Sequence, residues 1–86
     1  MRTSWTVDIE LHEDGDHTRA DAVADLAGRR YHGWGRARRN PVDPDVPKIG
    51  EELAAARALS DLAHQLLHAA VDDIEAFEGR PVRVHS

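Results

Sequence analysis

Two histidines one helical turn apart are the first residues in this sequence that could do chemistry. His64 and His68 occur in the run HQLLH, a spacing that places two imidazoles on one face of a helix. Zinc proteases combine this spacing with a glutamate base, but Gln65 occupies that position here. Asp61 and Asp72 could complete a surface site for zinc or nickel. The simpler interpretation is a solvated helix face with i, i+4 pairs, and we expect no bound metal or cofactor.

A second group of residues is basic and interleaved with aromatic side chains. Half of the arginines fall between positions 29 and 39, and no acidic residue occurs between positions 25 and 43. Arginine beside stacking aromatics on a sheet is one way in which proteins hold single-stranded nucleic acid. The candidate residues for such an anion or nucleic-acid site are Trp34, Arg36, Arg38 and Arg39. The competing interpretation is that aspartates on neighbouring strands pair with these arginines.

The remaining polar residues give no recognisable catalytic arrangement. The sequence HEDGDH at positions 12–17 lacks the alternating oxygen ligands and the distal glutamate of a calcium loop. No serine has a base at a meaningful spacing, cysteine is absent, and there is no glycine-rich phosphate loop. We therefore expect a protein that is not an enzyme, although an active site shared between subunits would escape this test.

A short antiparallel sheet must position the basic residues. Alternating apolar and polar residues predict three strands, over about 4–12, 17–27 and 30–38. Asp14 and Gly15 predict a hairpin turn after the first strand, and Gly28 with Arg29 a turn after the second.

Small residues on one face of the third strand predict how a helix packs on this sheet. Gly33 and Gly35 alternate with larger outward residues, and the lack of a side chain lets a helix backbone approach closely. The sequence therefore predicts an α+β fold, in which a three-stranded antiparallel sheet is packed by one long C-terminal helix.

The helix is predicted over about 48–77, after a proline-rich crossover at 40–47. Pro47 suits the first helical position, and Gly79 suits the end. Apolar residues fill an arc of roughly 180°, whereas a helix on one sheet needs a stripe of about 100°. The excess predicts contact with a second copy of the chain, as a homodimer or higher oligomer. The candidate interface residues are Leu59, Leu62 and Leu66.

Length and charge limit the remaining possibilities. The chain has 86 residues and a net charge of −5, which indicates one domain and argues against purely electrostatic binding to nucleic acid. No apolar run is long enough to span a membrane, and we expect a cytoplasmic protein. After the helix, Val82 and Val84 alternate with polar residues and are compatible with a short edge strand or a frayed end.

The residues also resemble a known family. The stretch at 33–67, GWGRARRNPVDPDVPKIGEELAAARALSDLAHQLL, looks like a family of small uncharacterised actinobacterial proteins. The earlier WTVDIELHEDGDHTRADA and the later DDIEAFEG are similar to it too, so the resemblance covers nearly the whole chain. It implies a fold like that of the double-stranded-RNA-binding domain and implies no assigned activity.

The residues argue against double-stranded RNA as the partner. The leading helix of that domain has no counterpart before the first strand, and the first loop is acidic. Lys48 is the only lysine at the opening of the last helix, where it faces Glu51 and Glu52. We therefore expect a homo-oligomeric interaction module, with single-stranded nucleic-acid or anion binding as the alternative.

Overall fold

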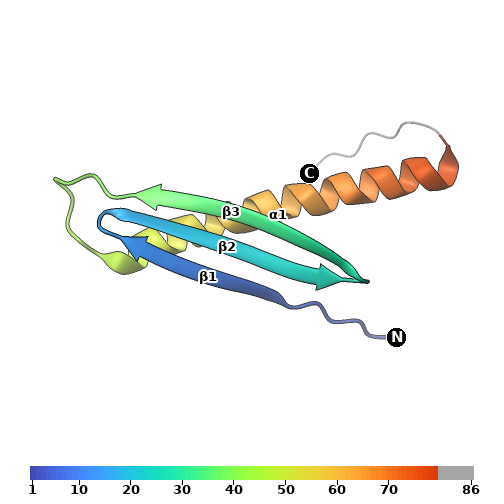
Figure 1. Ribbon diagram of the computed structural model, residues 1–86, viewed down its shortest axis with the longest axis horizontal. Helices are drawn as coiled ribbons and strands as arrows, with labels where there is room; N and C mark the ends of the chain where they lie inside the picture. Colours follow the sequence, from blue (N-terminus) through green and yellow to red (C-terminus); the bar gives the residue numbers. More distant parts are fainter. Residues whose placement is uncertain (80–86) are drawn as a thin grey trace.

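The computed structural model describes residues 1–79, which form one sheet and one helix in two layers (Figure 1). The strands are β1 (Val7–Asp14), β2 (His17–Leu26) and β3 (Arg29–Arg38), and the helix is α1 (Pro47–Glu78). The sheet is antiparallel in the order β1-β2-β3. The α+β fold class predicted from the sequence is confirmed. The edge strand considered at Val82 and Val84 lies outside the described residues.

Two tight turns set the register of the strands. Gly15, with φ of 62°, begins the turn between β1 and β2. Asp14 and His17 are the pair of residues next to this turn. The second turn consists of Ala27 and Gly28, with φ of 52° and 79°. It lies one residue earlier than predicted, because the hairpin geometry places two left-handed residues between Leu26 and Arg29. Nothing in the sequence marks alanine as a left-handed residue.

The layer between sheet and helix contains mostly small side chains. A Cβ atom added to Gly35 would lie 2.5 Å from the Ala58 nitrogen, and one added to Gly33 would lie 2.5 Å from the Ala58 carbonyl oxygen. The close approach predicted at these two glycines is therefore confirmed. The buried core of the described chain comprises Ala20, Ala22, Ala24, Leu26, Ala37, Ala54, Ala58 and Leu62.

The helix runs beyond the sheet. Its first residue is Pro47 and its last is Glu78. Gly79 caps this end, with φ of 71° and an N–H that donates to the Glu75 carbonyl oxygen at 2.6 Å. Its 32 residues extend past the β2–β3 turn, as Figure 1 shows. Within residues 1–79, no helix is both long and apolar enough to cross a membrane.

Candidate interaction surfaces

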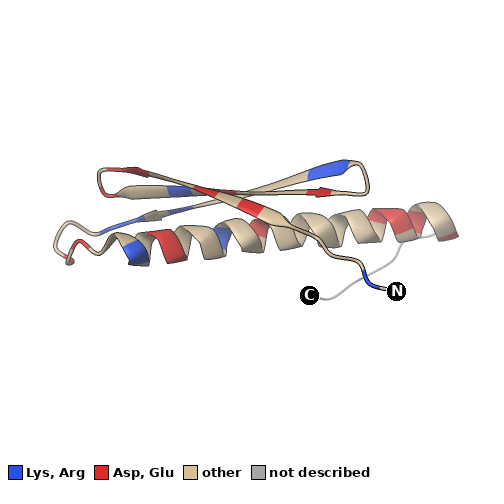
Figure 2. Ribbon diagram, turned by 90° about the horizontal axis from the view of Figure 1, so that it is seen from below, with Lys and Arg blue, Asp and Glu red and all other residues tan. Residues whose placement is uncertain are grey.

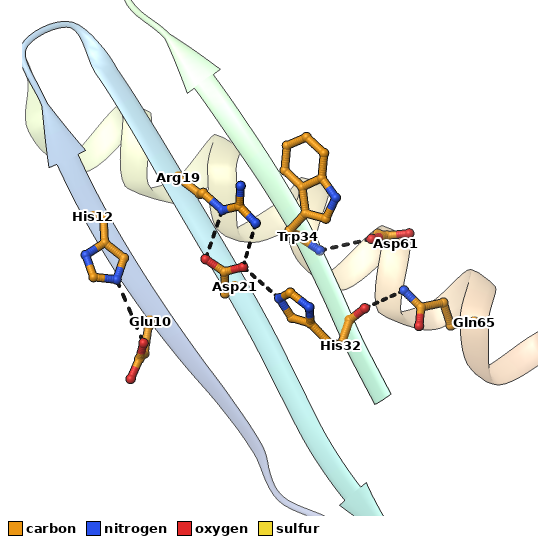
Figure 3. A network of polar contacts seen from close by, with 8 residues as sticks. All are labelled: Glu10, His12, Arg19, Asp21, His32, Trp34, Asp61 and Gln65. Atoms are coloured by element: carbon orange, nitrogen blue, oxygen red, sulfur yellow. Dashed lines mark hydrogen bonds and ion pairs between the residues drawn. The ribbon is translucent and has the colours of Figure 1, made fainter. Parts of the chain in front are cut away.

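The face of the sheet turned away from α1 holds a network of polar side chains (Figure 3). Asp21 of β2 accepts hydrogen bonds from Arg19 Nε at 3.1 Å and Arg19 Nη2 at 3.0 Å, and its Oδ1 lies 2.6 Å from His32 Nε2. The bonds from Arg19, and then His32, lower the pKa of Asp21 from 3.8 to about 2. The Arg19 guanidinium also lies 4.7 Å from the centre of the Trp34 ring. This network joins β2 to β3.

Three of the four candidate anion-binding residues share this outward face. Trp34, Arg36 and Arg38 alternate along β3 with residues that face α1. Arg39 follows the strand on the opposite side, where its Nη1 donates to the Asp43 carbonyl oxygen at 2.9 Å and its Nε lies 3.7 Å from Asp45 Oδ1. Within residues 1–79 the Arg36 guanidinium makes no ion pair or hydrogen bond, and Arg38 Nε lies 3.8 Å from Asp16. The predicted pairing with aspartates of neighbouring strands is therefore weak at Arg36 and Arg38, whereas Arg29 at the start of β3 pairs with Asp73 of α1 at 3.2 Å.

Charge on the outward face is divided between the two outer strands. The outward acidic residues of β1 are Asp8, Glu10 and Asp14, and the outward basic residues of β3 are Arg30, Arg36 and Arg38. Between them, β2 holds the paired Arg19 and Asp21. A phosphate chain could follow β3 but would be repelled by β1.

His64 and His68 on α1 are not joined by a third metal ligand within residues 1–79. His64 Nδ1 lies 2.9 Å from the Ser60 carbonyl oxygen. The Asp61 carboxylate, considered as a third ligand, accepts a hydrogen bond from the Trp34 backbone N–H at 2.9 Å. In the described part of the chain, no group of three or more histidine, cysteine or acidic side chains is placed to hold a metal ion.

The outer edge of β3 is occupied by side chains of α1. Arg57 Nη1 donates to the Arg36 carbonyl oxygen at 2.7 Å, and Gln65 Nε2 donates to the His32 carbonyl oxygen at 2.5 Å. Between them, Asp61 accepts from Trp34 as described above (Figure 3). Sequence analysis missed this role. The signal in the sequence was the spacing of four residues between Arg57, Asp61 and Gln65, which places the three polar side chains on one side of α1.

The apolar residues of β1 lie on the helix side of the sheet but are not covered. Val7, Ile9 and Leu11 pair with Ala24, Ala22 and Ala20, so their side chains share the face on which α1 packs. Their exposed fractions are nonetheless 38–39%, whereas the paired alanines are 0–1% exposed. Figure 1 shows that α1 crosses β2 and β3 and leaves most of β1 to one side.

One flank of α1 extends this uncovered apolar region. Leu59 projects about 160° from Arg57 on the helix, away from the β3 edge and toward β1. It is 41% exposed, and Leu66, on the same flank, is half-buried against the core. Leu62 is only 3% exposed and belongs to the core of the chain itself, which corrects its assignment to an intersubunit surface. We call Val7, Ile9, Leu11, Leu59 and Leu66 the apolar flank.

Comparison with known proteins places the chain among uncharacterised mycobacterial proteins. The Mycobacterium tuberculosis protein Rv2632c is 49% identical over 76 residues, which cover 88% of this chain and 82% of that protein. The Mycobacterium bovis protein Mb1767 is 46% identical over 80 residues, which cover 93% and 85%. The crystal structure of Rv2632c matches with a TM-score of 0.86 and 44% identity, covering 94% of this chain and 96% of that one. Residues 3–83 match the model of the Rv2632c-like family, and the chain belongs to that family.

Proposed function

We propose that this chain is a cytoplasmic, non-enzymatic interaction module that acts as a homodimer through the apolar flank. The observation that supports this function is the uncovered side of β1, where Val7, Ile9 and Leu11 are exposed beside a helix that covers the other two strands. Apolar side chains gathered in this way are typical of protein–protein contacts.

A second copy of the chain is the partner that fits best. Each copy has a strand without a helix above it and a helix flank without a strand below it. A twofold axis lets α1 of one copy lie on β1 of the other, and the same contact then forms twice. Residues 62–71 of α1 contain no lysine, arginine or acidic residue (Figure 2), so the contact need not bury a charge there.

The small core of one chain supports the same proposal. Six of its eight buried residues are alanines, and none of the large side chains within residues 1–79 is less than 2% exposed. A leucine or isoleucine that becomes fully buried adds roughly 1.5–3 kcal/mol. Burial of the apolar flank in a dimer would therefore add a large share of the total stability.

Light scattering coupled to size-exclusion chromatography tests the dimer. We expect the full chain to elute with twice the mass of one copy at micromolar concentration, and Leu59→Glu to elute as a monomer. Val42→Glu is the matched control, because Val42 is 84% exposed and lies outside the apolar flank. A monomeric parent chain, or a Leu59→Glu variant that stays dimeric, would contradict the proposal.

Single-stranded nucleic acid is the second candidate ligand, through Trp34, Arg36 and Arg38. The unpaired Arg36 guanidinium beside a Trp34 side chain that is 45% exposed supports it. The likeness to a double-stranded-RNA-binding domain stays a prediction, and the acidic β1 disfavours a duplex spread over the sheet.

Filter binding at two salt concentrations tests this second candidate. A single-stranded oligonucleotide should bind with a steep salt dependence and be lost when Arg36, Arg38 and Arg39 are all changed to alanine. Because Arg39 lies on the other side, Arg39→Ala alone should leave binding unchanged. Binding that does not respond to salt or to the triple variant would exclude the site.

A further inference from the structure

A pocket of about 430 Å³ lies where the β1–β2 turn, the end of β3 and the beginning of α1 meet. Its volume falls in the range of small-molecule sites. Part of its wall is apolar, with Ala37 from β3 and Val46, Ile49 and Leu53 around the first turns of the helix. None of the five residues of the apolar flank lines it, so the inference below does not depend on the proposed dimer.

Thr18 of β2 brings a hydroxyl group to this pocket. The residue is 8% exposed and lines the cavity, yet in the part of the chain that the structure describes its hydroxyl has no hydrogen-bond partner. A Cβ atom on Gly50 would lie 2.9 Å from Thr18 Oγ1, so the hydroxyl packs closely against the first turn of the helix. Because no buried side-chain oxygen within residues 1–79 is without a partner, Thr18 Oγ1 must keep some accessible surface. The Thr18 hydroxyl therefore offers an acceptor that a ligand in the pocket can reach.

The charges around the pocket favour a cation. Its two arginines are already paired, since Arg39 Nε lies 3.7 Å from Asp45 and Arg38 Nε lies 3.8 Å from Asp16. Asp45 and Asp16 line the pocket, and Glu13 and Asp43 add two further carboxylates. The lining therefore has an excess of negative charge.

Glu13 is a carboxylate of the lining with a raised pKa. It lies on β1 and faces the start of α1, where Glu51 contacts it. Partial desolvation, the hydrogen bond with Glu51 and repulsion from Glu51 and Asp45 all raise the pKa of Glu13. A positive group placed between Glu13 and Glu51 would remove that repulsion.

We propose that this pocket binds a small organic molecule with a primary ammonium group on an apolar body. The ammonium donates hydrogen bonds to the Glu13 carboxylate and to Thr18 Oγ1, and the apolar body packs against Ile49 and Leu53. An ammonium suits this place because it has three donors and no acceptor, which matches a set of oxygen acceptors.

Titration of the full-length, isotopically labelled chain with n-hexylamine tests the site by NMR. We expect saturable shifts at the amides of Thr18 and Gly50, and no such shifts with n-hexanol or hexanoate. Glu13→Gln and Thr18→Val should each weaken hexylamine binding by about tenfold, as the loss of one hydrogen bond to a charged group predicts. Glu10→Gln, on the outward face of the same strand, is the control and should bind as the parent chain does.

Three results would overturn this inference. They are an equal response to hexanol or hexanoate, unchanged affinity in both pocket variants, and shifts that map away from the pocket. The Leu59→Glu variant keeps every pocket residue, so the same titration on that variant separates this inference from the dimer. Retained binding there supports the pocket as a feature of one chain, and lost binding would contradict it.

Discussion

β3 and β1 are both edge strands of the same sheet, but only β3 has a helix beside its outer edge. Arg57, Asp61 and Gln65 occupy the outer backbone groups of β3. Within residues 1–79, none of the side-chain hydrogen bonds reaches the outer backbone of β1. Unpaired edges invite association, and folded proteins usually cover or blunt them. The outer edge of β3 is therefore covered by the helix of the same chain, whereas α1 leaves the outer edge of β1 open.

Replacing Gly35 with alanine tests the close contact between β3 and α1. Of the substitutions tested for stability, it should have the largest effect on the free energy of unfolding. The new methyl group would lie 2.5 Å from the Ala58 nitrogen and 2.7 Å from the Ala54 carbonyl oxygen, so the helix would have to move. We expect the free energy of unfolding in urea to fall by about 3 kcal/mol or more. Arg36→Ala, one residue later on the outward face, is the control and should change it by less than about 0.5 kcal/mol. A parent-like Gly35→Ala variant would mean that α1 is not held against β3.

Removing the Asp61 carboxylate tests the protection of the β3 edge. In Asp61→Ala the Trp34 backbone N–H loses its acceptor, and we expect a destabilisation of about 1–2 kcal/mol. Hydrogen exchange measured by NMR should show the Trp34 amide exchanging faster than in the parent chain. Asp61→Asn keeps an acceptor oxygen and should restore most of the protection. Unchanged exchange in the alanine variant would show that the edge is held by other means.

Ile9→Thr tests β1, the strand that α1 leaves uncovered. Ile9 is 39% exposed in one chain, so the substitution should cost less than about 1 kcal/mol when the protein is dilute. If the apolar flank is the dimer contact, the cost should grow as the concentration rises, because association stabilises only the folded state. Thermal unfolding at several protein concentrations gives this dependence. A cost that is independent of concentration would argue against β1 as the contact strand.

The smallest expected effect concerns the outward network that joins β2 to β3 and does not include β1. The pKa of Asp21 is about 2 in the folded chain, below its ordinary 3.8, so the unfolded chain takes up the proton first. The stability that the network adds is therefore complete above pH 3.8 and is lost as the pH falls toward 2. Urea unfolding of the parent chain and Asp21→Asn should differ at neutral pH and converge in acid. A difference that stays constant with pH would exclude this role for the Asp21 charge.

Much of the fold follows from local patterns in the sequence. The alternation of apolar and polar residues predicts the strands. The proline-rich crossover and Gly79 predict where the helix begins and ends. The sequence also shows small residues on one face of β2 and of β3, and Gly33 and Gly35 correctly predicted a closely packed helix. The alanines of β2 are weak strand formers, yet they form the central strand, which is paired on both sides and buried beneath α1.

The relation between the helix and the sheet could not be predicted in the same way. The apolar arc of α1 gave no sign of which strand it would leave uncovered, because that depends on where the chain crosses over. Leu62 was therefore assigned to the surface although it lies in the core. The pocket beside Thr18 also escaped, because its residues come from three separate elements and meet only in the folded chain.

The contact between the glycines of β3 and the backbone of α1 also bears on how this protein responds to pressure. There is no room for even one methyl group between the layers at Gly33 and Gly35, so the interior holds little empty volume at that place. Pressure unfolds proteins largely by eliminating such internal voids. A chain built in this way should lose little volume on unfolding and should keep its fold under compression.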